Sequence, residues 1–196
     1  GKIMDRYFEF QHNVKMLEEE PTQESGTLMV MHGLPFAGKT EFADKIARQN
    51  HNVIAIHLAD IKNSYPGGNA YQICKSMIIA ALVEGKSVVY DGMNLSRETR
   101  LDLLSTARQV EPKQCIIYNL KADTELLRKI AEIHGFDMES FDGMFDLYNR
   151  NHIDPETEGW DAIKNIDQNQ YIKNTYPEIA AATETESGDQ DDVIIL

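Results

Sequence analysis

Apolar residues follow two alternating patterns from Thr27 onward. Short apolar runs of strand length alternate with longer stretches in which apolar residues recur at helical spacing. The predicted strands cover residues 27–32, 53–58, 86–91, 114–120 and 162–166. The predicted helices cover residues 39–50, 69–84, 96–109, 123–134 and 137–150. Short buried strands separated by helices predict an α/β domain, with a parallel sheet covered by helices on both faces.

The two ends of the chain differ from this central pattern. Residues 3–19 carry apolar residues among charges, as in an amphipathic helix, and residues 21–26 read as a linker. The segment 182–196 is small, polar and acidic, so we expect it to be disordered. We therefore divide the chain into an amino-terminal helix and linker (1–26), one domain (27–181) and a tail (182–196). Because the sequence begins with Gly1, a longer parent protein is left open.

Composition narrows the class of partner. The net charge of −13 argues against a long grip on duplex nucleic acid, which needs many Lys and Arg contacts to phosphates, but leaves a nucleic-acid end or a nucleotide open. The two cysteines lie in apolar runs, so we expect buried free thiols. No stretch approaches the roughly 18 apolar residues of a membrane span, and no secretory signal is visible. We therefore expect a cytoplasmic protein without a membrane partner.

The segment between the first predicted strand and the first predicted helix reads G-x-x-x-x-G-K-T over residues 33–40. In such a phosphate-binding loop, or P-loop, backbone N–H groups surround a phosphate at the start of a helix. Lys39 would reach the outer phosphates of ATP, and the Thr40 hydroxyl would bind Mg²⁺. The predicted nucleotide-binding residues are Gly33, Pro35, Phe36, Ala37, Gly38, Lys39, Thr40 and Glu41.

The third predicted strand ends at Asp91. An acidic residue in this place holds Mg²⁺ or its water shell in P-loop proteins, so Asp91 is the second predicted metal residue. The alternative is a turn carboxylate. Asn94, Arg97 and Arg100 follow, and we predict that they bind the substrate. For the two arginines, a solvated helix face is the alternative, and Asn94 could instead orient the loop.

A second carboxylate, Asp60, follows the second predicted strand. It could accept the proton of a substrate hydroxyl that attacks the γ-phosphate, and its alternative role is a helix cap. His57 fits a core or hinge position better than a catalytic one.

The two predicted helices at 123–134 and 137–150 follow each other without a strand between them, as in a lid over the phosphates. Arg128 is the predicted lid cation, because its planar guanidinium suits phosphate oxygens better than the point charge of Lys129. An ion pair with Glu125 or Glu132 is the alternative for Arg128. Arg150 is a weaker second candidate.

Together these residues resemble the P-loop kinases that include the kinase domain of polynucleotide kinase and small zeta-toxin-like kinases. The resemblance covers residues 27–167 and rests on three segments: G-L-P-F-A-G-K-T at 33–40, V-V-Y-D-G-M-N-L at 88–95 and E-G-W-D at 158–161. It implies a sheet of order 2-3-1-4-5 and transfer of the ATP γ-phosphate to a hydroxyl, with Mg²⁺ as cofactor.

The sequence departs from the family pattern at three places. Phe36 stands where the family has a small residue, position 132 is Glu where a second lid arginine is common, and no Arg follows Asp60 at the usual spacing. An alignment shifted by one places Ala59 at the base position instead. The acceptor could be a polynucleotide 5′-hydroxyl, a nucleotide or a small metabolite. Two functions other than a kinase also stay open. One is an NTP-dependent module whose hydrolysis needs a partner, and the other is a non-catalytic scaffold.

Overall fold

The computed structural model describes residues 25–182, and the predicted amino-terminal helix, most of the linker and the tail from residue 183 lie outside this range. Its sheet has five strands, which lie within one residue of the predicted bounds at each end. The strands are β1 (Leu28–His32), β2 (Val53–His57), β3 (Ser87–Asp91), β4 (Cys115–Lys121) and β5 (Ala162–Asp167).

All neighbouring strands are parallel, and their order is β2-β3-β1-β4-β5. This confirms the α/β fold class and the order implied by the resemblance. The central strand β1 is buried along its whole length, with Leu28 beside Val88 on one side and Cys115 on the other. Because the strands are parallel, their carboxyl ends meet at one edge of the sheet.

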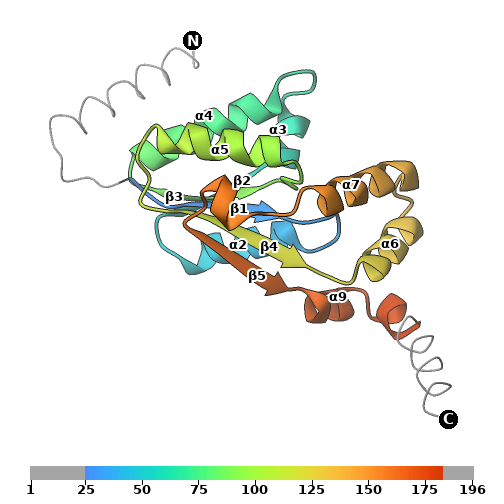
Figure 1. Ribbon diagram of the computed structural model, residues 1–196. Coiled ribbons are helices and arrows are strands. Elements are labelled where there is room, and N and C mark those ends of the chain that lie inside the picture. Colours follow the sequence, from blue (N-terminus) through green and yellow to red (C-terminus); the bar gives the residue numbers. More distant parts are fainter. Residues whose placement is uncertain (1–24, 183–196) are drawn as a thin grey trace, which may run out of the picture.

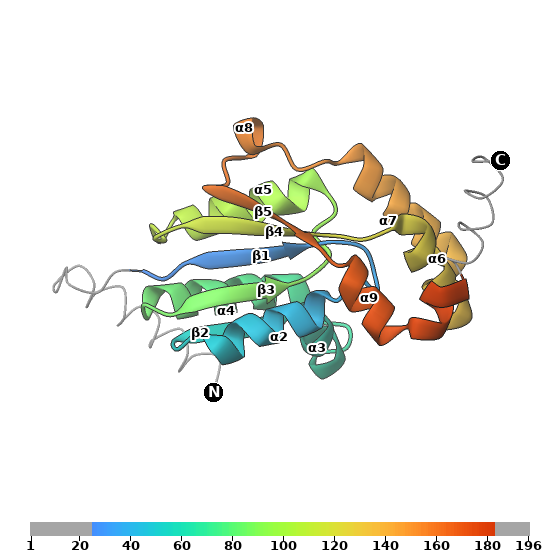
Figure 2. The same cartoon turned by 90° about the horizontal axis from the view of Figure 1, so that it is seen from below.

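Helices cover both faces of this sheet (Figures 1 and 2). α4 (Ala70–Val83) and α5 (Arg97–Arg108) lie on one face, and α2 (Lys39–Gln49) lies on the other. α6 (Thr124–Ile133) and α7 (Met138–Arg150), the helices of the predicted lid, lie at the carboxyl end of the strands. Cys74 and Cys115 are buried free thiols, as predicted.

Three helices have no counterpart in the sequence prediction: α3 (Leu58–Ser64), α8 (Pro155–Glu158) and α9 (Asn169–Thr175). All are short, and α3 buries no residue while α9 buries only Ile172. Such helices lack the long apolar stripe from which a helix is recognised in sequence. Contacts with neighbouring elements, rather than an apolar stripe of their own, position these three helices.

Arg100 is a correction to the predicted substrate site. Its side chain is completely buried, and Nε and Nη2 donate to the two carboxylate oxygens of Glu158 at 2.7 and 3.1 Å. The remaining N–H groups donate to the backbone carbonyls of Asn94, Leu95 and Asn151 at 2.8 to 3.0 Å. With every donor engaged, Arg100 neither lies on a solvated helix face nor offers a group to a substrate. It joins α5 to α8 and to the loop after β3.

We predict that Arg100→Leu destabilises the protein by about 3–5 kcal/mol, because it leaves the Glu158 carboxylate buried without its partner. Urea unfolding measures this change. Arg108→Leu on the same helix is the control: its ion pair with Asp161 is about 40% exposed on both sides, so its loss costs at most about 1 kcal/mol. Equal effects of the two substitutions would contradict the structural role of Arg100.

Candidate functional site

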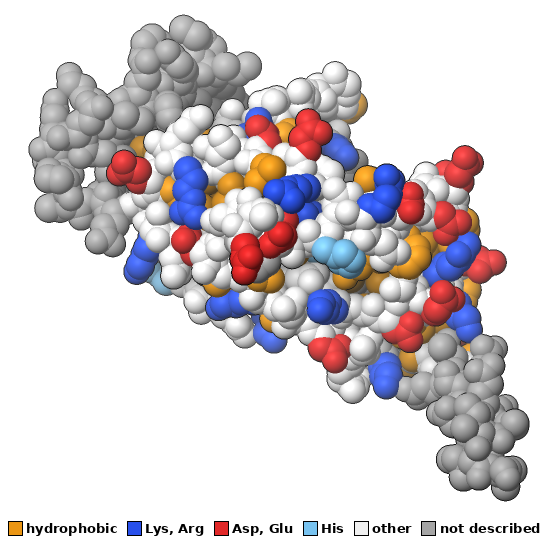
Figure 3. Space-filling view, viewed as in Figure 1, with side chains coloured by type: hydrophobic (Ala, Val, Ile, Leu, Met, Phe, Trp, Pro, Cys, Tyr) orange, Lys and Arg blue, Asp and Glu red, His pale blue; other side chains and the backbone are white. Residues whose placement is uncertain are grey.

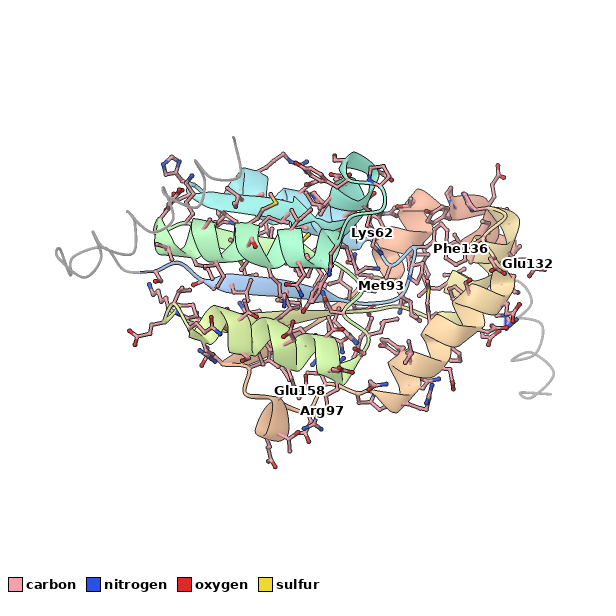
Figure 4. All side chains as sticks on the ribbon, turned by 90° about the horizontal axis from the view of Figure 1, so that it is seen from above. Lys62, Met93, Arg97, Glu132, Phe136 and Glu158 are labelled. Carbon is pink, nitrogen blue, oxygen red and sulfur yellow. The ribbon has the colours of Figure 1, made fainter. Side chains whose placement is uncertain are left out.

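The P-loop connects β1 to α2 at the carboxyl edge of the sheet. Gly38 has a φ of 85°, which its lack of a side chain allows, and it is the N-cap of α2. The N–H group of Gly33 donates to the Met93 carbonyl at 3.2 Å, which joins the start of the loop to the segment after β3. Figure 4 shows the labelled Met93 at the same end of the sheet as Lys62 of α3 and Phe136 before α7.

Lys39 folds back into the loop, where its Nζ donates to the Leu34 carbonyl at 2.7 Å. Burial lowers the pKa of Lys39 to about 8, although the charges of Asp91 and Glu41 act in the opposite direction. An anion beside Nζ would favour the charged form of this lysine. The loop therefore holds a cation whose charge depends on what lies next to it.

Thr40 and Asp91 are brought together by the pairing of β1 with β3. The Thr40 hydroxyl donates to Oδ2 of Asp91 at 2.7 Å, and Asp91 is buried. Both predicted metal residues are therefore adjacent, and the turn-carboxylate alternative for Asp91 does not describe this contact. A hydroxyl and a carboxylate are oxygen ligands of the type that Mg²⁺ takes, with waters and substrate phosphates completing its shell.

Sequence reasoning missed the partners of Asp91 on the β2 side. Nδ1 of His57 lies 2.7 Å from Oδ2 of Asp91, and Nε2 lies 2.7 Å from Oδ1 of Asp44 on α2. Burial lowers the pKa of His57, but the hydrogen bonds with the two carboxylates outweigh burial, and the net shift is upward. The histidine between two acids joins β2 and α2 to Asp91. The signal for His57 in the sequence was a polar residue at the end of an apolar strand.

Residues at the start of α9 and within it contact the P-loop. Nε2 of Gln168 donates to the Ala37 carbonyl at 3.0 Å. A side chain at Gly38 would lie 2.5 Å from a ring carbon of Tyr171, so glycine is needed here for space as well as for its positive φ. Glu41, in the first turn of α2, faces the same helix: burial and then its charge raise the pKa of Tyr171.

Phe36 adopts a φ of 70°, which is unfavourable for a bulky side chain. Its ring packs on the segment between α6 and α7, with ring centroids 5.6 Å from His134 and 5.9 Å from Phe136. The family departure at this position thus has a structural counterpart. An aromatic contact joins the phosphate loop to the predicted lid.

The two remaining residues of the predicted substrate site differ in exposure. Asn94 is buried, and its Nδ2 donates to the carbonyls of Met31 and Gly92 at 2.7 and 3.1 Å, so the geometry favours the loop-orienting role. Arg97 is exposed in the first turn of α5. Ser96 caps this helix by accepting a hydrogen bond from the Thr99 N–H group. Arg97 is thus the arginine of this pair that a ligand can reach.

Asp60, the predicted base, is exposed in the first turn of α3. The N-cap of α3 is His57, so Asp60 is not the cap residue that the alternative proposed. Ala59, the residue at the base position in the shifted alignment, is exposed on the same turn. The carboxylate at the end of β2 therefore faces solvent at the edge where the P-loop lies.

Arg128, the predicted lid cation, pairs with Asp142 of α7 and not with Glu125 or Glu132. The closest distance of this pair is 3.2 Å, and both side chains are about half exposed. Arg150 pairs with Asp146 within α7 at 3.0 Å. In this structure Arg128 joins α6 to α7, whereas Arg150 pairs only within α7. Both ion pairs are exposed and weak enough to exchange for another anion.

The fold and the loop define the class of P-loop proteins with kinase topology. A putative kinase from Chloroflexus aurantiacus has the same fold with a TM-score of 0.54 and 14% identity, over 84% of this chain and 98% of that chain. A fungal RNA kinase matches with a TM-score of 0.53 and 17% identity, over 72% and 74% of the two chains.

Within this class, the chain belongs to the family described as chromatin associated protein KTI12, whose model matches residues 27–162. A curated relative, transcription factor bHLH140 of Arabidopsis thaliana, is 29% identical over 103 residues. The match covers 53% of this chain and 11% of the plant protein. Between residues 25 and 182, no helix has the length and apolar character needed to cross a membrane.

We predict that nucleotide affinity falls as the pH rises above about 8. A bound phosphate raises the pKa of Lys39 above its value in the free protein, so binding takes up a proton once this lysine is neutral. The loss approaches roughly ten-fold per pH unit. Calorimetric titration with MgADP at pH 7 to 9.5, in buffers of different ionisation enthalpy, measures both quantities. Constant affinity without proton uptake would contradict the buried, shifted lysine.

We predict that Phe36→Ala loosens the segment between α6 and α7, because it removes the ring on which His134 and Phe136 pack. Hydrogen exchange should accelerate in both helices while the sheet stays protected. Phe42→Ala is the matched control, since the ring of Phe42 packs on Tyr118 of the sheet and not on the lid. If hydrogen exchange in α6 and α7 of the Phe36→Ala variant were unchanged, the Phe36 contact would not hold these two helices.

Proposed function

We propose that this protein is an ATP-dependent kinase that transfers the γ-phosphate to a substrate hydroxyl. The observation that carries the proposal is the 2.7 Å contact between Thr40 and Asp91 beside Lys39. This contact places a hydroxyl, a carboxylate and a cation around one phosphate-binding loop. P-loop enzymes use that set to hold ATP with its metal ion and to stabilise the charge of the transferring group.

The residues present fit Mg²⁺ bound together with ATP better than a metal held by protein alone. Within residues 25–182, no group of three or more His, Cys, Asp or Glu side chains is arranged to hold a metal ion. Thr40 and Asp91 would supply two oxygen ligands, and the phosphates of ATP together with water would supply the others. When bound, Mg²⁺ neutralises charge on the phosphates. Lys39 then exchanges the Leu34 carbonyl for phosphate oxygens.

On the acceptor side, we assign Asp60 as the base that accepts the proton of the attacking hydroxyl, because it is exposed in the first turn of α3, which follows β2 at the carboxyl edge of the sheet. Arg128 reaches the transferring phosphoryl group from the lid once its ion pair with Asp142 opens. Arg97 binds the acceptor.

A nucleotide-type acceptor, with a polynucleotide 5′-hydroxyl tested first, is supported by the shared fold with a fungal RNA kinase. In Figure 3, acidic and basic side chains are interspersed on the face shown. This distribution fits the contact with a strand end better than a grip along a duplex.

A second candidate function is an NTP-dependent module that hydrolyses nucleotide only with a partner bound. One observation favours it: the Arg128 side chain is held by Asp142. A partner that displaced Asp142 would complete the site. In that case, transfer to a hydroxyl would be replaced by transfer to water.

The test is transfer of labelled γ-phosphate from MgATP to 5′-hydroxyl oligonucleotides, nucleosides and sugars. We expect Lys39→Ala to lose at least about 100-fold in turnover while remaining folded, because it removes a cation from the transferring group. Lys45→Ala is the matched control, since Lys45 is exposed further along α2. Full activity of Lys39→Ala would refute the kinase proposal. Absence of transfer to every acceptor, with MgATP still bound, would favour the partner-dependent module.

A further inference from the structure

A hollow of about 430 Å³ lies over the carboxyl half of β4 and β5. His32, Asn119 and Asn165 line it from the sheet, and Tyr148 and His152 line it from the end of α7 and the following segment. Residues alternate between faces along a strand, so the His32 side chain shares the face of Leu28 and Val30, which pack with α4 and α5. α2 packs on the opposite face. The hollow is therefore distinct from the phosphate loop, although His32 directly precedes it.

His32 has an unused hydrogen-bonding group. Nδ1 of His32 lies 2.9 Å from Oδ1 of Asn119, and Nδ2 of Asn119 donates to Oδ1 of Asn165 at 3.0 Å. Because this network turns the Asn119 oxygen toward His32, Nδ1 carries the proton and Nε2 is an acceptor. Among the described residues, Nε2 has no hydrogen-bond partner, and His32 is only 2% exposed. An unsatisfied buried acceptor is costly, so its retention points to a ligand that donates to it.

Burial lowers the pKa of His32 to about 4, so the ring is neutral at physiological pH and Nε2 stays an acceptor. The ring is stacked with Tyr148, with centroids 5.3 Å apart and an angle of 20° between the planes. His152 and Tyr148 form an edge-to-face pair, with ring centroids 6.5 Å apart. The hollow thus combines an acceptor, side-chain amides and aromatic faces, which is the set that recognises unstacked bases.

The charged groups that line the hollow indicate which class of ligand it can bind. Although the protein has a net charge of −13, no carboxylate is among the described residues that line the hollow. Lys121 contributes a cation to its lining and is itself exposed. A ligand with a planar N–H donor and a negative group fits these features better than a neutral sugar. A volume of this size also lies within the range of small-ligand sites.

We propose that this hollow is a second nucleotide-binding site, in which a base donates an N–H group to Nε2 of His32, contacts Tyr148 and His152, and directs its phosphate toward Lys121. In this structure Nε2 is closed off from solvent. A base therefore reaches it when the Tyr148 side chain rotates away from the His32 ring. The nucleotide can be free or can be an unpaired residue of a single strand. The site does not depend on phosphoryl transfer at the P-loop.

The test keeps the P-loop saturated with MgADP and titrates the protein with the four nucleoside 5′-monophosphates and with short single-stranded oligonucleotides. We expect one further equivalent to bind. Tyr148→Ala should weaken it by about ten-fold or more, the scale of a lost base–aromatic contact. Tyr118→Ala is the matched control, because Tyr118 lies on β4 but packs with the core of the opposite face. Binding of monophosphates alone identifies a free nucleotide, and tighter binding of strands identifies an unpaired residue.

Two further variants protect the test against misfolding. Asn165 is exposed on the edge strand β5, so Asn165→Ala should fold and should weaken binding. His32→Phe keeps a ring but removes the acceptor, and it should weaken binding, whereas His51→Phe on the surface should not. The proposal is overturned if no nucleotide binds besides the one at the P-loop, or if all three variants at the hollow bind it like the wild type. Lys39→Ala, which tests the kinase proposal, should leave this second equivalent intact.

Discussion

The carboxylate of Asp91 is the point on which the arrangement of the site depends. Its Oδ2 meets the hydroxyl of Thr40 and the imidazole of His57, each at 2.7 Å, and so joins the end of β3 to α2 and β2. Thr40 and Asp91 are 51 residues apart in sequence. They meet because β1 and β3 pair in parallel, so that both strands end at the same edge. The loop chemistry thus follows from the sheet topology.

Much of the fold could be predicted from sequence because strands β1 to β4 are mostly apolar and the main helices are long. The positions of the P-loop and of Asp91 could be predicted as well, since each follows from a local sequence pattern at a strand end. Arg97 and Arg100 show where local pattern fails. Both are arginines near the start of one helix, yet one is exposed and the other completely buried. The difference depends on Glu158, which is 58 residues away from Arg100.

The histidines show the same limit at the strand ends. His32 and His57 each end a strand of the sheet. His57 lies between two carboxylates, and its pKa is raised, whereas His32 is buried beside an amide, and its pKa is lowered. Sequence shows two polar residues in equivalent places, but the opposite shifts come from neighbours on other elements. Only the assembled sheet distinguishes a histidine held between two carboxylates from one that offers a neutral acceptor.

The energies of individual contacts indicate which parts of this domain are held most weakly. The left-handed conformation of Phe36 costs about 1–2 kcal/mol, and its aromatic contacts with His134 and Phe136 return roughly 0.5–1.5 kcal/mol each beyond their burial. The exposed Arg128–Asp142 pair adds about 0–1 kcal/mol. These terms nearly cancel, whereas breaking the buried Arg100–Glu158 pair costs about 3–5 kcal/mol. The contacts that Phe36 and Arg128 make with the lid segment are therefore cheaper to break than the link between α5 and α8.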